Sequence, residues 1–381
     1  MRVLLPALAI LLSACGSDAP DGLALASPAT EASAAEAVGV TVEEVATGLD
    51  GPWGLAFLPD GRVLVTERTG QLRVVTLDGD VSAPLAGVPE VHVERQGGLL
   101  DVALDPAFEA NRLVYLAFSR PGPRGTSATA VGRGRLGEGA LEDVEILFTQ
   151  EGYHGRGFHF GSRIVFGPEG HLFASTGDRF LFGPAQDLSD HLGVIVRLNP
   201  DGSVPEDNPF VGQAGAQPEI WSYGHRNVQS LAFDPATGVL WEAEYGPKGG
   251  DELNRIEAGV NYGWPEVSWG DNYDNTPIPD PPTRPEFTDA VVQWTPVISP
   301  SGMAFYTGDV FPSWSGDLLI SSLSQQGIVR VEIDGEAVTG QEVIELGRRI
   351  RDLEEGPDGH VYVLTDGGSG ALWRLSPEAG E

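Results

Sequence analysis

One pattern recurs along this chain: an apolar strand, a tight turn and a second apolar strand. The first copy is Gly54-Leu-Ala-Phe-Leu-Pro-Asp-Gly-Arg-Val-Leu-Val65, and the last is Leu353-Glu-Glu-Gly-Pro-Asp-Gly-His-Val-Tyr-Val-Leu364. Pro-Asp-Gly suits a hairpin because proline presets φ and glycine supplies a positive φ. The other copies lie at 100–116, 164–174, 231–241 and 303–320. The chain therefore repeats one hairpin six times.

The spacing of these copies, roughly 45 to 70 residues, is typical of a blade of four antiparallel strands. The repeats predict an all-β fold: a six-bladed β-propeller with four-stranded antiparallel blades, over residues 40–377. A pair of packed β-sheets is the alternative, but its strands would not recur in such similar hairpins. The stretches 119–160, 175–225 and 262–300 are expected to be loops that gather around the central channel.

The N-terminal segment predicts export. Arg2 precedes an apolar run, Val3 to Leu12, which is too short to span a bilayer and fits the hydrophobic region of a secretory signal. The next residues, Leu-Ser-Ala-Cys, closely resemble the end of a bacterial lipoprotein signal, with Cys15 as the lipidated residue. An ordinary signal peptide with a chance cysteine is the alternative. Because Cys15 is the only cysteine, no intramolecular disulfide is possible.

Residues 1–15 are therefore expected to be a lipoprotein-type signal peptide. Residues 16–39, rich in Ala, Ser, Pro and Glu, are expected to be a flexible tether. These features predict a periplasmic or cell-surface lipoprotein that touches a bacterial membrane only through its lipid. The formal net charge of −32 repels phosphate backbones, which argues against a nucleic-acid partner.

His159 is the candidate general base. It lies a few residues before the third hairpin, and a histidine titrates near neutrality. Asp178 follows at the far end of that hairpin, which brings its two ends together. We therefore expect Asp178 to accept the hydrogen bond that fixes the tautomer of His159. A structural or merely exposed histidine is the alternative.

Arginines form a second group of candidates. Arg226 follows the fourth blade's Trp-Ser-Tyr-Gly-His segment, and Arg349 and Arg351 precede the last hairpin. Alternate residues of an extended segment point to one face, so Arg349 and Arg351 would act together. Guanidinium groups bind carboxylates in a bidentate manner, so these arginines can converge on a multiply carboxylated anion. Surface salt bridges to the surplus of acidic residues are the alternative.

Three further positions carry weaker signals. Gln96, beside two glycines, can offer its amide to a ligand, or belong to a polar turn. The carbonyls of Gly246 and Pro247 stand at a turn, and calcium accepts backbone oxygens readily. Asp251 and Glu252 are either ligands of a second calcium or turn caps.

Taken together, a set of segments resembles the glucose/sorbosone dehydrogenase family, the soluble aldose sugar dehydrogenases that use pyrroloquinoline quinone. The segments run in the family's order and cover roughly residues 45 to 375. They are Pro52-Trp-Gly-Leu-Ala-Phe57, Gln96-Gly-Gly-Leu-Leu-Asp101, His159 with Gly161-Ser-Arg163, Gly177-Asp178, Gly224-His-Arg-Asn227, Tyr245-Gly-Pro247 with Gly250-Asp-Glu-Leu-Asn254, Asn261-Tyr-Gly-Trp264 and Arg349-Ile-Arg-Asp352.

The resemblance implies an oxidoreductase that converts an aldose to its lactone and passes electrons to an unidentified acceptor. It implies His159 as the base toward the anomeric hydroxyl, Asp178 as its orienting partner and Arg226 as the group that stabilises charge on the quinone oxygen. The remaining roles follow by position. Gln96, Asn227, Arg349 and Arg351 would hold the quinone, and the carbonyls of Gly246 and Pro247 would bind calcium.

One departure from the family's pattern stands in the fifth blade. Family members often carry a lysine after this strand, where the present chain has Ser321-Ser-Leu-Ser324. The loss of that cation is expected to weaken cofactor binding. Two alternatives to the dehydrogenase remain: a non-catalytic ligand-binding propeller on the cell surface, and a lactonase-type hydrolase with a channel metal held by carboxylates and asparagines.

Overall fold

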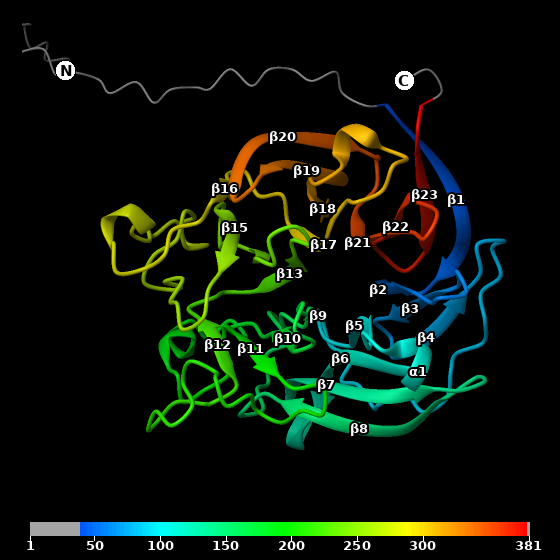
Figure 1. Cartoon of the computed structure of the whole chain (residues 1–381). Helices are drawn as coiled ribbons and strands as arrows, with labels where there is room; N and C mark the ends of the chain where they lie inside the picture. Colours follow the sequence, from blue (N-terminus) through cyan, green and yellow to red (C-terminus); the bar gives the residue numbers. More distant parts are fainter. Residues whose placement is uncertain (1–38, 379–381) are drawn as a thin grey trace, which may run out of the picture. The chain divides into compact units, whose positions relative to one another are not determined.

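The computed structural model describes residues 39–378, and their strands form six antiparallel sheets around a ring (Figure 1). Helical structure in this part of the chain is limited to five short segments, which are α1 (Phe108–Asn111), η1 (Pro123–Gly125), η2 (Gly183–Gln186), η3 (Pro281–Thr283) and η4 (Pro312–Trp314). The predicted six-bladed propeller is confirmed.

The blades follow one another along the chain, each formed by consecutive strands. The first two blades are β2 (Pro52–Phe57), β3 (Val63–Glu67) and β4 (Gln71–Val75), then β5 (Leu99–Leu104), β6 (Leu113–Pro121), β7 (Ser127–Leu136) and β8 (Leu141–Thr149). The next two are β9 (Ile164–Phe166), β10 (Leu172–Ser175), β11 (Val194–Leu198) and β12 (Ile220–Tyr223), then β13 (Val228–Phe233), β14 (Leu240–Glu244), β15 (Asp251–Ile256) and β16 (Val292–Trp294).

The fifth blade is β17 (Pro300–Phe305), β18 (Leu318–Ser322), β19 (Gly327–Asp334) and β20 (Ala337–Glu345). The sixth combines β21 (Ile350–Glu355), β22 (Val361–Thr365) and β23 (Gly370–Pro377) with the first strand of the propeller, β1 (Val40–Leu49). Val40 pairs with Pro377, so the two ends of the described chain close the ring. This pairing gives the sixth blade its fourth strand and closes the ring.

Two details differ from the expected regular blades. The first sheet has three strands, and a single bridge between Val75 and Val81 stands where a fourth would begin. The stretches 119–160, 175–225 and 262–300 were expected to be loops, but they contain the strands β7, β8, β11, β12 and β16. Among these strands β8 is largely exposed and carries three acidic residues, which hides it from a search for apolar strands. β7 and β11 are mostly buried, and they were missed because they lie outside the repeated hairpin.

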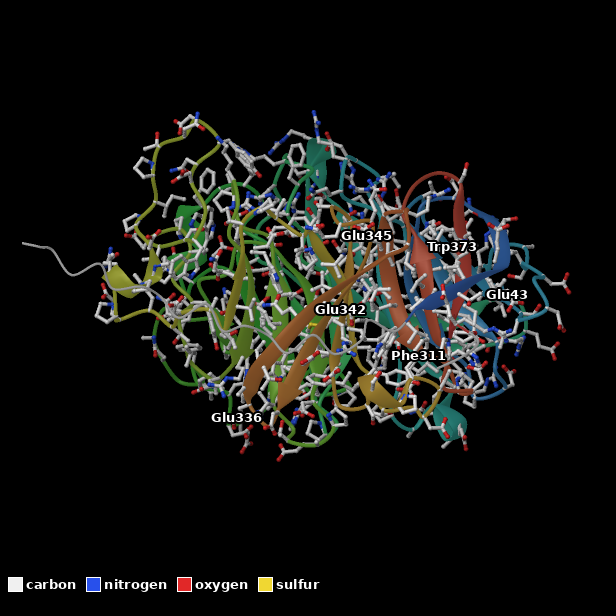
Figure 2. All side chains as sticks on the ribbon, turned by 90° about the horizontal axis from the view of Figure 1, so that it is seen from above. Glu43, Phe311, Glu336, Glu342, Glu345 and Trp373 are labelled. Atoms are coloured by element: carbon white, nitrogen blue, oxygen red, sulfur yellow. The ribbon has the colours of Figure 1, made fainter. Side chains whose placement is uncertain are left out.

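The larger hydrophobic cores lie between neighbouring blades. Leu64 of β3 packs with Val114 and Phe118 of β6, and Trp241 of β14 packs with Leu318 and Ile320 of β18. The outer edge of the fifth blade is acidic. Figure 2 labels Glu342 and Glu345 on the outermost strand β20, and Glu336 at the turn before it. Charged side chains on an edge strand discourage pairing with other chains.

Arg163 occupies the propeller axis. Its buried guanidinium lies 3.0 Å from Asp101 Oδ1 and 3.0 Å from Asp352 Oδ1, and its Nε donates to the carbonyl of Gln229 at 2.7 Å. The two carboxylates also accept the backbone N–H groups of Ile164 and Leu55. The guanidinium stacks on Trp53 and lies within hydrogen-bond reach of Ser301 Oγ and the carbonyl of Arg351. One side chain therefore joins all six blades.

The Arg163 network separates two cavities. Residues at the N-terminal ends of the innermost strands line one cavity of about 430 Å³. Residues toward the C-terminal ends of these strands line another cavity of about 560 Å³. Two buried carboxylates around one guanidinium leave an excess negative charge. Burial accordingly raises the pKa of Asp352 to about 7, and the neighbouring Asp101 adds to this against the attraction of Arg163.

The predicted signal peptide, Cys15 and nearly all of the predicted tether lie outside the described residues. Within residues 39–378, no helix is long and apolar enough to cross a membrane.

Candidate functional site

The 430 Å³ cavity opens where the chain enters the innermost strands, and its wall is cationic. Four arginines line it against two aspartates, an inversion of the charge balance of the whole chain. The charged lining residues are Arg68, Arg95, Arg349, Arg351, Asp50 and Asp366. A cleft with a net positive lining in an acidic protein attracts anionic ligands.

Arg349 and Arg351 both face Asp366, as their alternation predicted. Arg349 Nε donates to Asp366 Oδ2 at 2.8 Å, and Arg351 donates to Oδ1 through Nε at 3.0 Å and Nη2 at 2.7 Å. These two guanidinium groups share one carboxylate, so one positive charge remains for a ligand. The salt-bridge alternative is thus partly correct, because Asp366 offsets one of the two positive charges.

Gln96 links the cavity to His159. Its Oε1 accepts the backbone N–H of His159 at 2.7 Å, while the residue itself is exposed and lines the cavity. The neighbouring residues Phe160 and Gly161 also line the cavity. His159 thus lies directly behind the cavity wall, with 4% of its surface exposed.

His159 and Asp178 form the expected pair. His159 Nδ1 lies 2.6 Å from Asp178 Oδ1, and the indole N–H of Trp264 donates to Oδ2 at 2.8 Å. His159 Nε2 forms no hydrogen bond to any described residue and is not sealed from solvent. With Nδ1–H donated to the carboxylate, Nε2 is the nitrogen that can accept a proton.

Electrostatics keep this pair in the state that a base requires. Burial lowers the pKa of His159 below its ordinary 6.5, and the charge of Arg226 adds to this, while the hydrogen bond to Asp178 opposes it. Burial would raise the pKa of Asp178, but the hydrogen bond from His159 and the charge of Arg226 outweigh it and lower that pKa below 3.8. The imidazole is therefore neutral and the carboxylate ionised at neutral pH.

The backbone around this pair is constrained. His159 has a φ of +50°, a region that non-glycine residues rarely adopt. Gly177 permits the close approach of Asp178, since a Cβ there would lie 2.2 Å from the carbonyl oxygen of His159. Arg179 holds the loop by donating to the carbonyls of Phe158 and Ser127 at 3.0 and 2.9 Å. The imidazole is thereby fixed in place.

Arg226 and Asn227 stand beside this pair, at the start of β13. Both backbone N–H groups donate to Glu244 Oε2, at 2.5 and 3.1 Å. The guanidinium of Arg226 donates to the carbonyls of Tyr245 and Gly246 at 3.0 and 2.8 Å, and its Nε has no partner among the described residues. Asn227 Oδ1 accepts the N–H of Gly161, a residue of the cavity wall, at 3.1 Å.

The turn at Gly246 and Pro247 is held by Asp251. Its Oδ1 accepts the N–H of Gly246 at 3.0 Å, and its Oδ2 accepts the N–H of Ser299 at 2.6 Å. Asp251 is thus a turn cap. The carbonyl of Gly246 faces the guanidinium of Arg226, so a calcium ion at that oxygen and Arg226 would share it or compete for it.

The predicted residues therefore form two adjoining groups. Gln96, Arg349 and Arg351 line the cavity, whereas His159, Asp178, Arg226, Asn227, Gly246 and Pro247 lie behind or beside its wall. Tyr245 lines the cavity and connects the groups through its carbonyl. The sequence analysis did not predict Arg68 and Arg95. The scarcity of basic residues, which pointed to the other arginines, is the signal that could have found these two.

Ser324 lies near the rim of the cavity. Its side chain is exposed, and its Oγ is 2.5 Å from the Oγ of Ser299, which lines the cavity. The position at which the resemblance expects a lysine is therefore close enough to influence a bound anion.

Comparisons with known proteins identify the family of this chain. Residues 49–374 match the family described as Glucose / Sorbosone dehydrogenase. The aldose sugar dehydrogenase of Escherichia coli (strain K12) is 44% identical over 347 residues, covering 89% of this chain and 93% of that protein.

Solved structures give the same result. The soluble aldose sugar dehydrogenase of Escherichia coli in its apo form has a TM-score of 0.85 and 42% identity, covering 89% of this chain and 100% of that one. The pyrroloquinoline quinone-bound form of aldose sugar dehydrogenase from Streptomyces coelicolor has a TM-score of 0.74 and 31% identity, covering 90% and 99%.

Proposed function

The chain belongs to the glucose/sorbosone dehydrogenase family, and we propose that it oxidises the anomeric carbon of an aldose to a lactone, with pyrroloquinoline quinone as the hydride acceptor. The observation that carries this proposal is a cationic cavity with a neutral, oriented histidine directly behind its wall. The bound quinone of the Streptomyces coelicolor relative supports the choice of cofactor.

The residues present fit such a cofactor. Pyrroloquinoline quinone is a planar tricarboxylate, and the cavity offers Arg68, Arg95 and the Arg349–Arg351 pair as fork-shaped donors. When bound, the quinone supplies the carbonyl carbon that accepts a hydride. Gln96 and Asn227 would add amide contacts, and the carbonyls of Gly246 and Pro247 would hold a calcium ion.

The protein's contribution is to move a proton and to stabilise charge. His159 Nε2 would take the proton of the anomeric hydroxyl as the C1–H bond breaks, which leaves the lactone as product. Asp178 would stabilise the imidazolium formed at that moment, because its ionised carboxylate already accepts Nδ1–H. Arg226 would stabilise the negative charge that develops on the quinone oxygen.

The N-terminal sequence completes the proposal. The Leu-Ser-Ala-Cys15 segment supports a lipoprotein exported to the periplasm or cell surface, with residues 16–39 as the tether. The enzyme would then deliver its electrons outside the cytoplasm to an acceptor of unknown identity. The hydrolase alternative is less well supported, because the two axial carboxylates are already paired with Arg163.

Reconstitution tests the function. Purified protein incubated with pyrroloquinoline quinone and calcium is expected to bind the quinone and to reduce a redox dye when an aldose is added. A panel of aldoses, with a non-reducing sugar as the control, would identify the substrate class. Quinone binding without dye reduction would favour the non-catalytic binding propeller, and the absence of both would rule out the dehydrogenase.

Replacing Ser324 with lysine is expected to tighten quinone binding about two- to five-fold, the range of one partly exposed ion pair. The new ammonium group would stand beside Ser299 at the cavity rim. Fluorescence titration of the apoprotein with quinone measures the effect. Ser315→Lys is the matched control, since it adds the same charge at an exposed position of the same blade. Equal affinities of both variants would contradict the prediction.

A further inference from the structure

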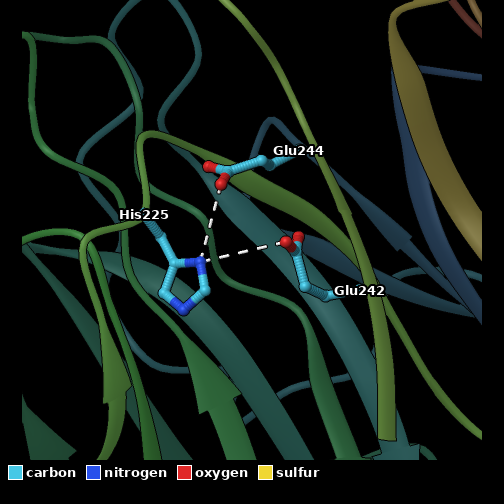
Figure 3. A group of neighbouring side chains, drawn as sticks. All are labelled: His225, Glu242 and Glu244. Atoms are coloured by element: carbon cyan, nitrogen blue, oxygen red, sulfur yellow. Dashed lines mark ion pairs between the residues drawn. The ribbon is translucent and has the colours of Figure 1, made fainter. Parts of the chain in front are cut away.

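His225, in the β12–β13 connection, forms a buried cluster with Glu242 and Glu244 of β14 (Figure 3). His225 and Glu242 are fully buried, and Glu244 is 4% exposed. The imidazole Nδ1 points between the two carboxylates, 3.8 Å from Glu242 Oε1 and 3.5 Å from Glu244 Oε1. The proposed dehydrogenase function assigns no role to this cluster.

Two fully buried atoms of the cluster have no hydrogen-bond partner within residues 39–378. These are Nδ1 of His225 and Oε2 of Glu242. Neither carboxylate forms an ion pair with an arginine or lysine in this part of the chain, and the guanidinium of the adjacent Arg226 is directed to the carbonyls of Tyr245 and Gly246. Within the described residues their only charged partner is His225, and a protonated imidazole would offset just one of the two carboxylates, so a buried negative charge would stay unbalanced, which is strongly unfavourable. The arrangement therefore calls for a cation.

The hydrogen bonds around the cluster orient its ligand atoms. Ser222 Oγ lies 2.9 Å from His225 Nε2, so a proton on Nε2 leaves the lone pair of Nδ1 facing the carboxylates. Asn254 Nδ2 donates to Glu242 Oε1 at 2.8 Å. The Nδ1–carboxylate separations exceed the usual N–H···O distance of about 2.7–3.2 Å, so a direct hydrogen bond does not explain them.

We propose that His225, Glu242 and Glu244 bind one divalent transition-metal ion of the Zn²⁺ class. Bonds of about 2.0–2.2 Å to imidazole nitrogen and carboxylate oxygen place such ligand atoms roughly 3–4 Å apart. The two Nδ1–oxygen separations of 3.8 and 3.5 Å fall in this range, and all three ligand atoms lie within 4.8 Å of one another. A divalent ion balances the charges of the two carboxylates. The imidazole ligand favours a transition metal, because calcium prefers oxygen ligands throughout.

This site is separate from the Gly246 and Pro247 carbonyls, but it adjoins Arg226 and Asn227, which stand beside the cavity. Glu244 directs Oε1 toward the cluster, while its Oε2 accepts the backbone N–H groups of Arg226 and Asn227. A metal ion held by Glu244 would thus fix the start of β13 against the end of β14. We assign this ion a structural role, because none of the three residues lines the 430 Å³ cavity.

Metal content tests the proposal without quinone or sugar. Wild-type protein, stripped with a chelator and titrated with Zn²⁺, is expected to retain about one equivalent through gel filtration and to gain thermal stability. Co²⁺ in place of Zn²⁺ should give visible absorption bands of a nitrogen- and oxygen-ligated ion. Metal analysis of the chelated and reloaded protein measures the stoichiometry.

Glu242→Gln keeps the side-chain shape and removes one ligand charge. It is expected to weaken Zn²⁺ binding at least about 100-fold and to abolish the Co²⁺ bands. Glu169→Gln is the matched control, because Glu169 forms an exposed pair with His171, 3.8 Å apart, and should leave the bound metal unchanged.

Three results would overturn the proposal. The first is wild-type protein that holds neither Zn²⁺ nor Co²⁺ after titration. The second is a site that binds Ca²⁺ but no transition metal. The third is equal Zn²⁺ retention by wild type and Glu242→Gln. Because the wild-type measurements stand alone, the proposal stays testable even if Glu242→Gln does not fold.

Discussion

His159→Asn is expected to lower kcat for aldose oxidation by about 10²- to 10⁴-fold, the usual contribution of a positioned general base. Asparagine suits this position because it tolerates the φ of +50° that His159 adopts, so the loss would not reflect backbone strain. Quinone affinity should change little, since His159 lies behind the wall of the cavity rather than in it. Steady-state kinetics with dye, together with quinone titration, separates the two effects.

The pH profile gives an independent test of the same role. A base must be deprotonated to act, and burial lowers the pKa of His159 below 6.5. Activity should therefore be constant above pH 6.5 and fall only as the pH drops through that lowered pKa. Asp178→Asn removes the carboxylate that fixes Nδ1–H, so it should also reduce kcat while retaining bound quinone.

His154→Asn is the control for this pair of variants. His154 lies five positions earlier in the same loop, and its backbone pairs with Ser127 rather than with the site. Its replacement should leave kcat within about two-fold of wild type, because the half-buried His154 side chain forms no hydrogen bond to His159, Asp178 or Arg226. Turnover that survives in His159→Asn would show that another group accepts the proton.

Some of these features were predictable because they depend on neighbouring residues. The six hairpins carry their turns in their own sequence, and the hairpin of β9 and β10 brings His159 and Asp178 together without any distant contact. The pairing of Val40 with Pro377 is different. It joins opposite ends of the propeller, and no local pattern marks β1 as the partner of β23.

The same limit explains the residues that were missed. Arg68 and Arg95 reach the cavity only because the first two blades stand next to each other in the ring. The buried cluster of His225, Glu242 and Glu244 depends on the pairing of β13 with β14. This pairing brings Glu244 against the chain that follows His225. Long-range closure, rather than local propensity, decides which charged side chains meet.

Arg163→Met is expected to lower the free energy of unfolding by about 3–5 kcal/mol, the cost of removing one partner of a buried ion pair. Methionine retains much of the side-chain volume but leaves Asp101 and Asp352 without their shared cation. It also removes the contacts to Gln229 and Trp53 that tie neighbouring blades to the axis. Denaturant unfolding followed by tryptophan fluorescence measures the loss.

The size of this loss should depend on pH. Burial raises the pKa of Asp352 to about 7 in the folded protein, whereas the unfolded carboxyl ionises near 3.8. Below both values the carboxyls are neutral and need no cation, so Arg163→Met should cost least in acid. Above pH 7, the variant must either bury two ionised carboxylates without their cation or keep them protonated at a cost in free energy. The difference in unfolding free energy between Arg163→Met and wild type should therefore be largest there.

Removing the two charges together with the cation should recover much of the stability, because replacing a whole buried charge network is far less costly than breaking it. The triple variant Arg163→Met, Asp101→Asn, Asp352→Asn is therefore expected to unfold at a higher denaturant concentration than Arg163→Met alone. Arg62→Met is the surface control; its exposed pair with Asp60 should contribute no more than about 0.5 kcal/mol. A single variant as stable as wild type at pH 8 would mean that the axial arginine is dispensable, and that packing between adjacent blades alone holds the ring.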